Sequence, residues 1–474
     1  MAYTTIDDPS AYFHTQLYTG TGSSQSITND ANAGDFQPDW IFAKNRSDSA
    51  GHIAFDSSRG VNKNLTVNST DAESTVTTQV TAFNTDGFTM GSNNGANGSS
   101  DSLVAWQWKA GGTTPTKTYK VVVVSDGGNK YRFRNSGDTA TFAQSAVTLD
   151  LQEGGTYIFD QSDSSNSGHP LRFSETSNGS WGGGSEYTTG VTTSGTAGNA
   201  GAFTQITVSA SAPTLYYYCT QHSGMGGQVN TNTTHGQTNF DGSTLSVSQA
   251  NTTAGFSIVT YTGTGSNATV GHGLNSAPQI VLLKGRSNSG DWQMYNTNLS
   301  GTNKTISINT SDAANTESSP YYSFNNTAPT STVFSLGSGN TTNGSSRTFV
   351  AYCFAEIQGY SKFGSYTGNG NADGTFVYLG FKPAWVMVKL SSGSGEDWHM
   401  FDSKRSTSNV VKERLIANSA AAENANDSIL DFLSNGFKFR ENNAGWNGNN
   451  NTYIYMAFAE HPFVSSEGVP TTAR

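Results

Sequence analysis

The sequence predicts an all-β protein assembled from tandem β-sandwich domains of jelly-roll type. Three observations indicate this fold class: helical periodicity is nearly absent, short apolar runs bounded by proline and polar turns recur, and one construction occurs three times. The repeat period, about 105 residues, is too long for a solenoid repeat. Each copy is therefore expected to be a whole domain.

The three copies share an opening, a central apolar run and a closing strand-like stretch. The openings start at Tyr18, Tyr261 and Tyr366, the apolar runs at Pro38, Pro278 and Pro383, and the closing stretches centre on Ala105, Ala351 and Ala457. Pro383 follows Pro278 by 105 residues and Ala457 follows Ala351 by 106, which predicts that copies two and three are in register. Such short apolar runs are typical of strands buried on both faces or of a sandwich core.

These matches predict the domain organisation. The expected order is repeat one (1–112), a linker (113–118), a non-repeating block (119–231), a linker (232–254), repeat two (255–357), repeat three (358–463) and a frayed tail (464–474). The joint between repeats two and three is only Gln358-Gly359-Tyr360, so these two are expected to pack as a fixed pair, with repeat one set apart.

Local signals add two expectations. Asp86-Gly87 and Asn435-Gly436 stand at matching places before a phenylalanine, and Asx-Gly pairs supply the positive φ angles of tight hairpins. The Ala-rich stretch 419–432 is the best candidate for a helix.

Composition narrows the function classes. Charged residues make up 13% and the net charge is 25 − 35 = −10, with no basic stripe, so a nucleic-acid partner is not expected. No apolar run approaches the ~18 residues of a membrane span, and the N-terminus lacks the features of a signal peptide. The two cysteines fall in different blocks, which favours folding in a reducing cytoplasm without a disulfide.

The non-repeating block contains the sharpest chemical pattern in the chain. Its last predicted strand runs into LYYYCTQHSGMGG, and His169 in GHPLRF lies 50 residues before Cys219. The block resembles the cupredoxins, the blue-copper Greek-key β-sandwiches, and its C-x-x-H-x-x-M run is similar to the ligand loop of the amicyanin-like subgroup. The resemblance implies a type-1 copper-like site formed by His169, Cys219, His222 and Met225.

Those residue types suit copper. A thiolate and two imidazoles make a trigonal ligand set, and a thioether supplies a weak axial contact that tunes the potential. The alternative is that Cys219 is a small buried apolar residue and the histidines satisfy local hydrogen bonds.

Two equivalent turns carry an Asp and an Arg three residues apart. These are Asp56 to Arg59 and Asp402 to Arg405. They are either a sugar-binding rim, with Trp398 or His52 nearby, or Asp-initiated turns closed by an Arg salt bridge. The second interpretation is favoured, since repeat two has Tyr295-Asn296-Thr297 at this place.

Trp181 and Trp446 lie among Gly and Asn, so they are candidates for stacking on a glycan, and equally for capping a core or contacting another protomer. No carboxylate pair, nucleophile elbow, phosphate loop or dinucleotide fingerprint stands out, so no catalytic residue is assigned and an enzyme is not expected.

The repeats themselves resemble β-sandwich modules in structural and adhesion proteins of marine tailed bacteriophages. The phrases LYTGTG, FQPDWIFAKNR, FDSSRG, DGFTM and VAWQWKAGG of repeat one carry the resemblance. It implies lectin-like, concanavalin-type sandwiches in a virion protein assembled in the host cytoplasm, most simply a homotrimeric tail fibre or receptor-binding protein. Its partners would be other virion proteins and a host-surface glycan or receptor, bound multivalently. The alternatives are a capsid decoration or head-fibre protein, a copper-binding redox protein and a surface-polysaccharide depolymerase.

Overall fold

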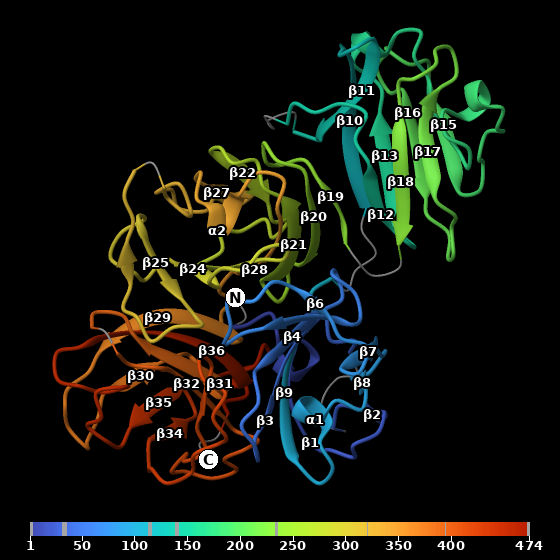
Figure 1. The fold of residues 1–474 in the computed structure, drawn as a ribbon. Coiled ribbons are helices and arrows are strands. Elements are labelled where there is room, and N and C mark those ends of the chain that lie inside the picture. The colour runs from blue at the N-terminus through green and yellow to red at the C-terminus, as the bar shows by residue number, and fades with distance from the viewer. Residues whose placement is uncertain are drawn as a thin grey trace.

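The computed structural model describes residues 3–30, 36–111, 116–137, 142–232, 236–319, 321–393 and 395–471. As the sequence predicts, the fold is all-β, and the helices in these ranges are short turns. The strands form three repeated units and one separate sandwich (Figure 1). We call them unit one (3–111), the insert (116–232), unit two (236–357) and unit three (358–463).

Unit one combines a large antiparallel sheet with a small one. The large sheet has the order β1 (Phe13–Thr19), β9 (Ser102–Trp108), β3 (Trp40–Asn45), β4 (Ile53–Asp56), β5 (Lys63–Thr66) and β6 (Ser74–Thr75); the small sheet has β2 (Gln25–Ile27), β8 (Phe88–Met90) and β7 (Val80–Phe83); the helices are η1 (Pro9–Ala11) and α1 (Asn94–Asn97). Asp86-Gly87 forms the predicted hairpin between β7 and β8, and Gly87 adopts φ +79°, which favours glycine.

Unit two has the same plan with extra strands. Its large sheet has the order β19 (Gln237–Asn239), β20 (Ser246–Asn251), β21 (Phe256–Thr262), β28 (Thr348–Phe354), β23 (Ile280–Gly285), β24 (Gln293–Asn296), β25 (Lys304–Ser307) and β26 (Asn315–Thr316); the small sheet has β22 (Ala268–Gly271) and β27 (Val333–Leu336); the helix is α2 (Asn340–Asn343). The prediction of a linker at 232–254 is wrong, because β19 and β20 pair onto the edge of β21.

Unit three repeats the plan once more. Its large sheet has the order β29 (Ser361–Thr367), β36 (Thr452–Pro462), β31 (Phe381–Leu390), β32 (Trp398–Asp402) and β33 (Leu415–Ile416); the small sheet has β30 (Phe376–Tyr378), β35 (Gly436–Phe439) and β34 (Leu430–Leu433). The predicted helix at 419–432 is absent. Leu430 and Phe432 lie in β34 instead, where both side chains are buried in the core of the unit, and Val411 bridges to Leu430.

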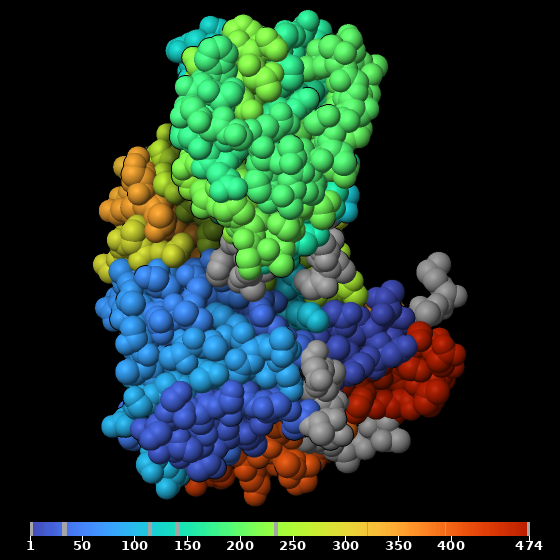
Figure 2. All heavy atoms as spheres, turned by 90° about the vertical axis from the view of Figure 1, so that its right-hand side faces the viewer, coloured from blue at the N-terminus to red at the C-terminus, as the bar shows by residue number. Residues whose placement is uncertain are grey.

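The insert is a two-sheet β-sandwich with an apolar core that also takes in Phe240 of unit two. One sheet has β11 (Asn129–Asn135), β10 (Thr116–Ser125), β13 (Thr156–Asp160), β16 (Phe203–Thr207) and β15 (Val191–Ser194); the other has β12 (Leu149–Gln152), β18 (Gly227–Asn232), β17 (Leu215–Cys219) and β14 (Leu171–Ser174); the helices are η2 (Ser164–Asn166) and η3 (Gly179–Gly182). Of the expected linker 113–118, residues 116–118 begin β10, and 113–115 lie outside the described residues. Figure 2 shows the insert as a lobe above the units.

The central strand of each unit is buried on both faces, which explains its continuous apolar run. In β3, Ile41 and Ala43 point toward the small sheet of unit one, while Trp40 and Phe42 point the other way, because successive side chains alternate between faces. The same alternation holds in β23 and β31. Each large sheet therefore serves two cores at once.

The second core is shared by all three units. It gathers aromatic and aliphatic side chains from each large sheet: Trp40 and Trp108 from unit one, Leu282 and Tyr352 from unit two, Trp385 and Phe458 from unit three. Trp40 and Tyr352 stack with ring centroids 4.5 Å apart, and Trp108 meets Trp385 edge to face at 5.8 Å. The three large sheets thus enclose one core (Figure 1).

The units contact one another in a closed cycle. At equivalent positions Trp292 Nε1 donates to Thr66 O (3.1 Å), Trp398 Nε1 donates to Ser307 O (2.9 Å), and His52 Nε2 lies 2.9 Å from Ile416 O. Unit one therefore contacts unit two, two contacts three, and three contacts one. Units two and three pack together, as expected, but the expectation that unit one is set apart is wrong: the three form a ring with pseudo-threefold symmetry.

Strand pairing also corrects the proposed alignment of the closing strands. Phe354 lies opposite Ile280 and Phe458 lies opposite Trp385, so these two phenylalanines are equivalent. Ala457 then matches Cys353, two residues after Ala351. The prediction from Pro278 and Pro383 agrees with the pairing, whereas the match of the two alanines was out of register by two.

The end of the chain folds back on its beginning. Val464 bridges to Pro470, and Ser466 N donates to Asp7 Oδ1 at 2.6 Å, so the described part of the tail, 464–471, is not frayed. The described residues include no helix with the length and apolar character of a membrane span.

Candidate metal centre

The strands of the insert bring together residues that are far apart in the sequence. β14 and β17 pair antiparallel, with Leu171 opposite Cys219. His169 precedes β14 by two residues, and His222 follows Cys219 in the loop that leads to β18. Because neighbouring strands lie about 4.8 Å apart, this pairing places His169 beside the loop after Cys219.

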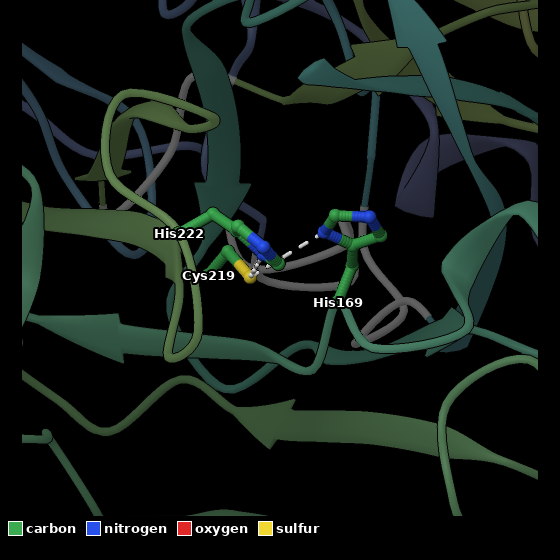
Figure 3. A group of neighbouring side chains, drawn as sticks. All are labelled: His169, Cys219 and His222. Carbon is green, nitrogen blue, oxygen red and sulfur yellow. Dashed lines mark hydrogen bonds between the residues drawn. The ribbon is translucent and has the colours of Figure 1, made fainter.

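Both imidazoles present Nδ1 to the cysteine sulfur (Figure 3). Cys219 Sγ lies 3.9 Å from His169 Nδ1 and 3.8 Å from His222 Nδ1. One ligand atom from each residue lies within 4.8 Å of the others. With metal–sulfur and metal–nitrogen bonds of about 2.3 and 2.05 Å, two ligands of one trigonal ion would be about 3.8 Å apart. The observed spacing fits a single ion held by all three residues.

Backbone contacts fix the ligand-bearing segments. The N–H of Gln221 points at Cys219 Sγ at 3.4 Å, and such a donor stabilises a thiolate. The carbonyl of His169 accepts from Tyr131 Oη (2.8 Å) and from Gln161 Nε2 (2.9 Å). At Gly226 a Cβ would lie 1.7 Å from Tyr217 O, so the loop can return to β18 only with glycine there.

The three side chains differ in their exposure to solvent. Cys219 is buried, His169 is half-buried and His222 is exposed. Burial, and then the charge that His222 can carry, lower the pKa of His169 below its usual 6.5. His222 lines an open pocket of about 330 Å³ together with Gly168, Pro170 and Gln221, so this edge of the centre faces solvent.

Met225 is placed in the same apolar cluster as Cys219 and is buried. Its backbone carbonyl accepts from Tyr131 N at 3.0 Å, which anchors the end of the loop. His169, Cys219 and His222 form a cluster that does not depend on Met225. The role of Met225 as a fourth ligand stays a prediction.

The two candidate glycan-contacting tryptophans differ sharply. Trp446 is 1% exposed and packs edge to face on His399 at 5.1 Å, so the interpretation as an exposed stacking platform is wrong for this residue. Trp446 is instead a buried member of the apolar core of unit three. Trp181 is 52% exposed, and its indole N–H donates to Cys219 O at 3.0 Å. No sequence signal linked Trp181 to the centre, because η3 approaches β17 only in the tertiary structure.

The Asp–Arg turns are structural. Arg59 N donates to Asp56 Oδ1 (2.7 Å) and Arg405 N to Asp402 Oδ1 (2.8 Å), and both ion pairs are fully buried. The favoured interpretation, an Asp-initiated turn closed by an Arg salt bridge, is confirmed, and the carboxylates form no exposed rim.

Fold and site together define the class: an all-β protein of three ring-forming sandwich units that carries a separate sandwich with a His–Cys–His cluster. A family model described as a domain of unknown function, DUF7483, matches residues 8–130 and 229–462, and the chain belongs to this family. The match omits 131–228, which contains the His–Cys–His cluster. Neither the curated proteins nor the solved structures compared contain a match to this chain.

Proposed function

We propose that this protein is a structural and attachment component of a tailed-bacteriophage particle, a tail fibre or receptor-binding protein that contacts the host surface. The observation that carries the proposal is the closed ring. Each unit buries one face of its large sheet against the other two units, which leaves the outer surfaces and the insert for contact with partners. The resemblance of the repeats to phage adhesion modules supports the same function.

The ring also has a consequence for how many copies of the chain a threefold particle component needs. Three equivalent units already surround one axis within a single chain, so the chain itself has the threefold form that a homotrimer of smaller subunits would supply. We propose that it acts on the particle as a preassembled pseudo-trimer, alone or in further copies, with other virion proteins and a host glycan or receptor as its partners.

Immunogold imaging of particles from a phage encoding this chain tests the proposal. Label at the tail tip supports a receptor-binding protein, and label on the head supports the capsid decoration or head-fibre alternative. Absence of label from intact and detergent-opened particles would overturn a virion function. Adsorption assays with added purified chain complete the test, since a receptor-binding protein should slow adsorption in proportion to its concentration.

The insert supports a second candidate function, copper binding. His169, Cys219 and His222 would hold the ion, with Met225 as the proposed axial ligand, and the fit rests on the two sulfur–nitrogen spacings near 3.8 Å. Bound copper would supply one-electron redox chemistry. The chain's own residues hold the thiolate in a buried position, orient both imidazoles and leave His222 exposed.

Titration of the purified chain with Cu(II) tests this candidate. An intense visible thiolate-to-copper band at one equivalent per chain is expected. The band should be lost in Cys219→Ser and kept in Cys353→Ser, a matched change of the other buried cysteine. No band with the wild-type chain would contradict a copper site.

A further inference from the structure

The outer edge of strand β21 in unit two is covered by another strand of the same chain, β20. Strand β20 pairs with β21, and Gln249 lies opposite Ile258. The carboxamide of Gln249 reaches across to unit one, where Nε2 donates to Asp39 (2.7 Å) and Oε1 accepts from the hydroxyls of Ser57 (2.9 Å) and Ser58 (2.8 Å). A polar, uncharged strand thus seals the junction of units one and two.

At the equivalent junction of units three and one, the described residues include no such strand. β1 is the terminal strand of its sheet, as β21 would be without β20. Phe13 and Phe256 both pair with the closing strand at equivalent positions, so Thr15 corresponds to Ile258. A pocket of about 340 Å³ lies at this place, within the range of ligand-binding pockets.

The walls of the pocket correspond to the residues that hold Gln249. Trp40 pairs with Asp56 and Trp385 pairs with Asp402, so Ala384, Ser403 and Lys404 match Asp39, Ser57 and Ser58. All three of these unit-three residues line the pocket, as do Phe13 and Thr15 of β1.

Two buried polar atoms at the pocket lack a partner among the described residues. The Thr15 hydroxyl belongs to a residue only 4% exposed, and Glu460 Oε2 is also inaccessible, while Oε1 of the same carboxylate is held by Lys382 at 3.3 Å. Leaving a buried hydroxyl or carboxylate oxygen without a hydrogen-bond partner is unfavourable, because the atom has lost its contact with water. Together they offer a donor and an acceptor to an incoming amide, as Ser57 and Asp39 offer them to Gln249.

The charges around the pocket favour a neutral occupant. Lys404 Nζ lies 2.6 Å from Asp30 Oδ2, Glu460 pairs with Lys382, and burial lowers the pKa of His14. In the described part of the chain, the acidic and histidine side chains of the pocket do not converge as metal ligands would.

The third junction is closed in another way. Asn298 of unit two, at the position of Ser58 and Lys404, donates from Nδ2 to Phe363 O on β29 at 3.2 Å. The three equivalent strand edges therefore differ: the edge of β21 is covered by a strand, the edge of β29 is bridged by a side chain, and the edge of β1 borders a pocket.

We propose that this pocket is a strand-acceptor site: an extended, uncharged segment of a partner protein, carrying a Gln or Asn side chain, adds to the outer edge of β1 as β20 adds to β21. Backbone pairing would supply affinity, and the amide between Thr15 and Glu460 would supply specificity. The inference rests on the ring geometry and is independent of the virion and copper proposals.

The probe is a fluorescein-labelled peptide with the sequence of residues 246–252, SVSQANT, titrated with the full chain and followed by anisotropy. Saturable binding is expected, and it should weaken about tenfold, or about 1.4 kcal/mol, when Leu replaces the Gln of the peptide. In hydrogen exchange, the peptide should protect amides in 13–16 and leave those in 361–367 unchanged.

Protein variants locate the site. Ala384→Phe fills the pocket and Thr15→Val removes the hydroxyl with little change of shape; each should weaken binding about tenfold or more. Asn298→Ala, at the equivalent junction of units two and three, is the matched control and should bind normally. Circular dichroism checks that each variant is folded. If Ala384→Phe does not fold, Thr15→Val still tests the proposal.

Three results would overturn the proposal. The first is no saturable binding and no protection by the wild-type chain. The second is binding that neither Thr15→Val nor Ala384→Phe weakens. The third is protection of 13–16 by neutral oligosaccharides but not by the peptide, which would make the pocket a saccharide site instead.

Discussion

The junctions of the ring share one geometry but differ in chemistry. Between units one and two, Tyr352 Oη donates to Asp56 Oδ2 (2.6 Å), and Arg286 pairs with Glu73 (2.9 Å). Between units three and one, the donor to Asp402 Oδ2 is Trp106 Nε1 (3.0 Å).

An outer pair, Arg46 with Glu423 at 2.6 Å, accompanies that second contact. At the junction of units two and three, Met456 stands in place of the buried donor and Asn296 in place of the aspartate. Ser391 and Ala314 stand where the other two junctions have the Arg and the Glu of the outer pair. The closed cycle therefore depends on apolar burial common to all three junctions, and the ion networks are additions at two of them. Buried ion pairs contribute little to stability compared with apolar packing, yet leaving one partner alone is costly.

Removing one carboxylate at a charged junction should have the largest effect. Asp56→Ala leaves the fully buried Arg59 with Glu73, at 3.1 Å, as its remaining acidic partner, so the free energy of unfolding should fall by up to about 3–5 kcal/mol. Asn296→Ala, at the equivalent place in unit two, is the control and should cost much less. Urea denaturation measures both, and equal losses would show that the ion network is irrelevant.

Removing the indole hydrogen bond between Trp106 and Asp402 should lower the free energy of unfolding by less. Trp106→Phe removes the N–H that Asp402 accepts and should cost about 1.5–3 kcal/mol more than Trp385→Phe. Trp385 is equally buried in the shared core, and its Nε1 has no partner among the described residues, so it controls for lost volume. Chemical denaturation at neutral pH is the measurement; indistinguishable losses would argue against a contribution from this hydrogen bond.

Acid should weaken the junction of units three and one in particular. Burial, and then the charge of Lys44, lower the pKa of His52 to about 3, whereas the unfolded chain takes up this proton below about 6.5. The unfolded state binds more protons between these values, so the free energy of unfolding falls as pH falls, by about 2 kcal/mol at pH 5. His52→Gln should remove this part of the pH dependence, measured by denaturation at pH 7 and pH 5. An unchanged slope would mean that His52 is not buried as a neutral ring.

The smallest effect on the ring is expected from the insert, whose apolar core is distinct from the shared core of the ring and includes one residue of unit two, Phe240. Cys219→Ser should shift only the calorimetric transition of the insert and leave that of the ring unchanged. Cys353→Ser lies in the core of unit two and should shift the ring transition instead. A single transition that both variants shift equally would show that ring and insert unfold as one.

Much of the local structure could be predicted from sequence patterns. The apolar run that begins at Trp40 indicated a strand either buried on both faces or in a sandwich core, and Cys219 with His222 indicated one ligand loop. These features depend on residues that lie close together in the sequence. β20 was missed because its Ser, Gln and Asn residues have the composition of a linker, although they are buried in a junction.

The chain's residue order determined its all-β class, its threefold repeat and its candidate copper ligands, since strand periodicity, turn chemistry and ligand type are local properties. Only the tertiary structure decided that the three units close into a ring, that Trp446 is buried while Trp181 approaches Cys219, and that one edge of the ring keeps a pocket. The reason is physical: alternation shows that a strand has two apolar faces, but what covers the second face depends on contacts between residues hundreds of positions apart.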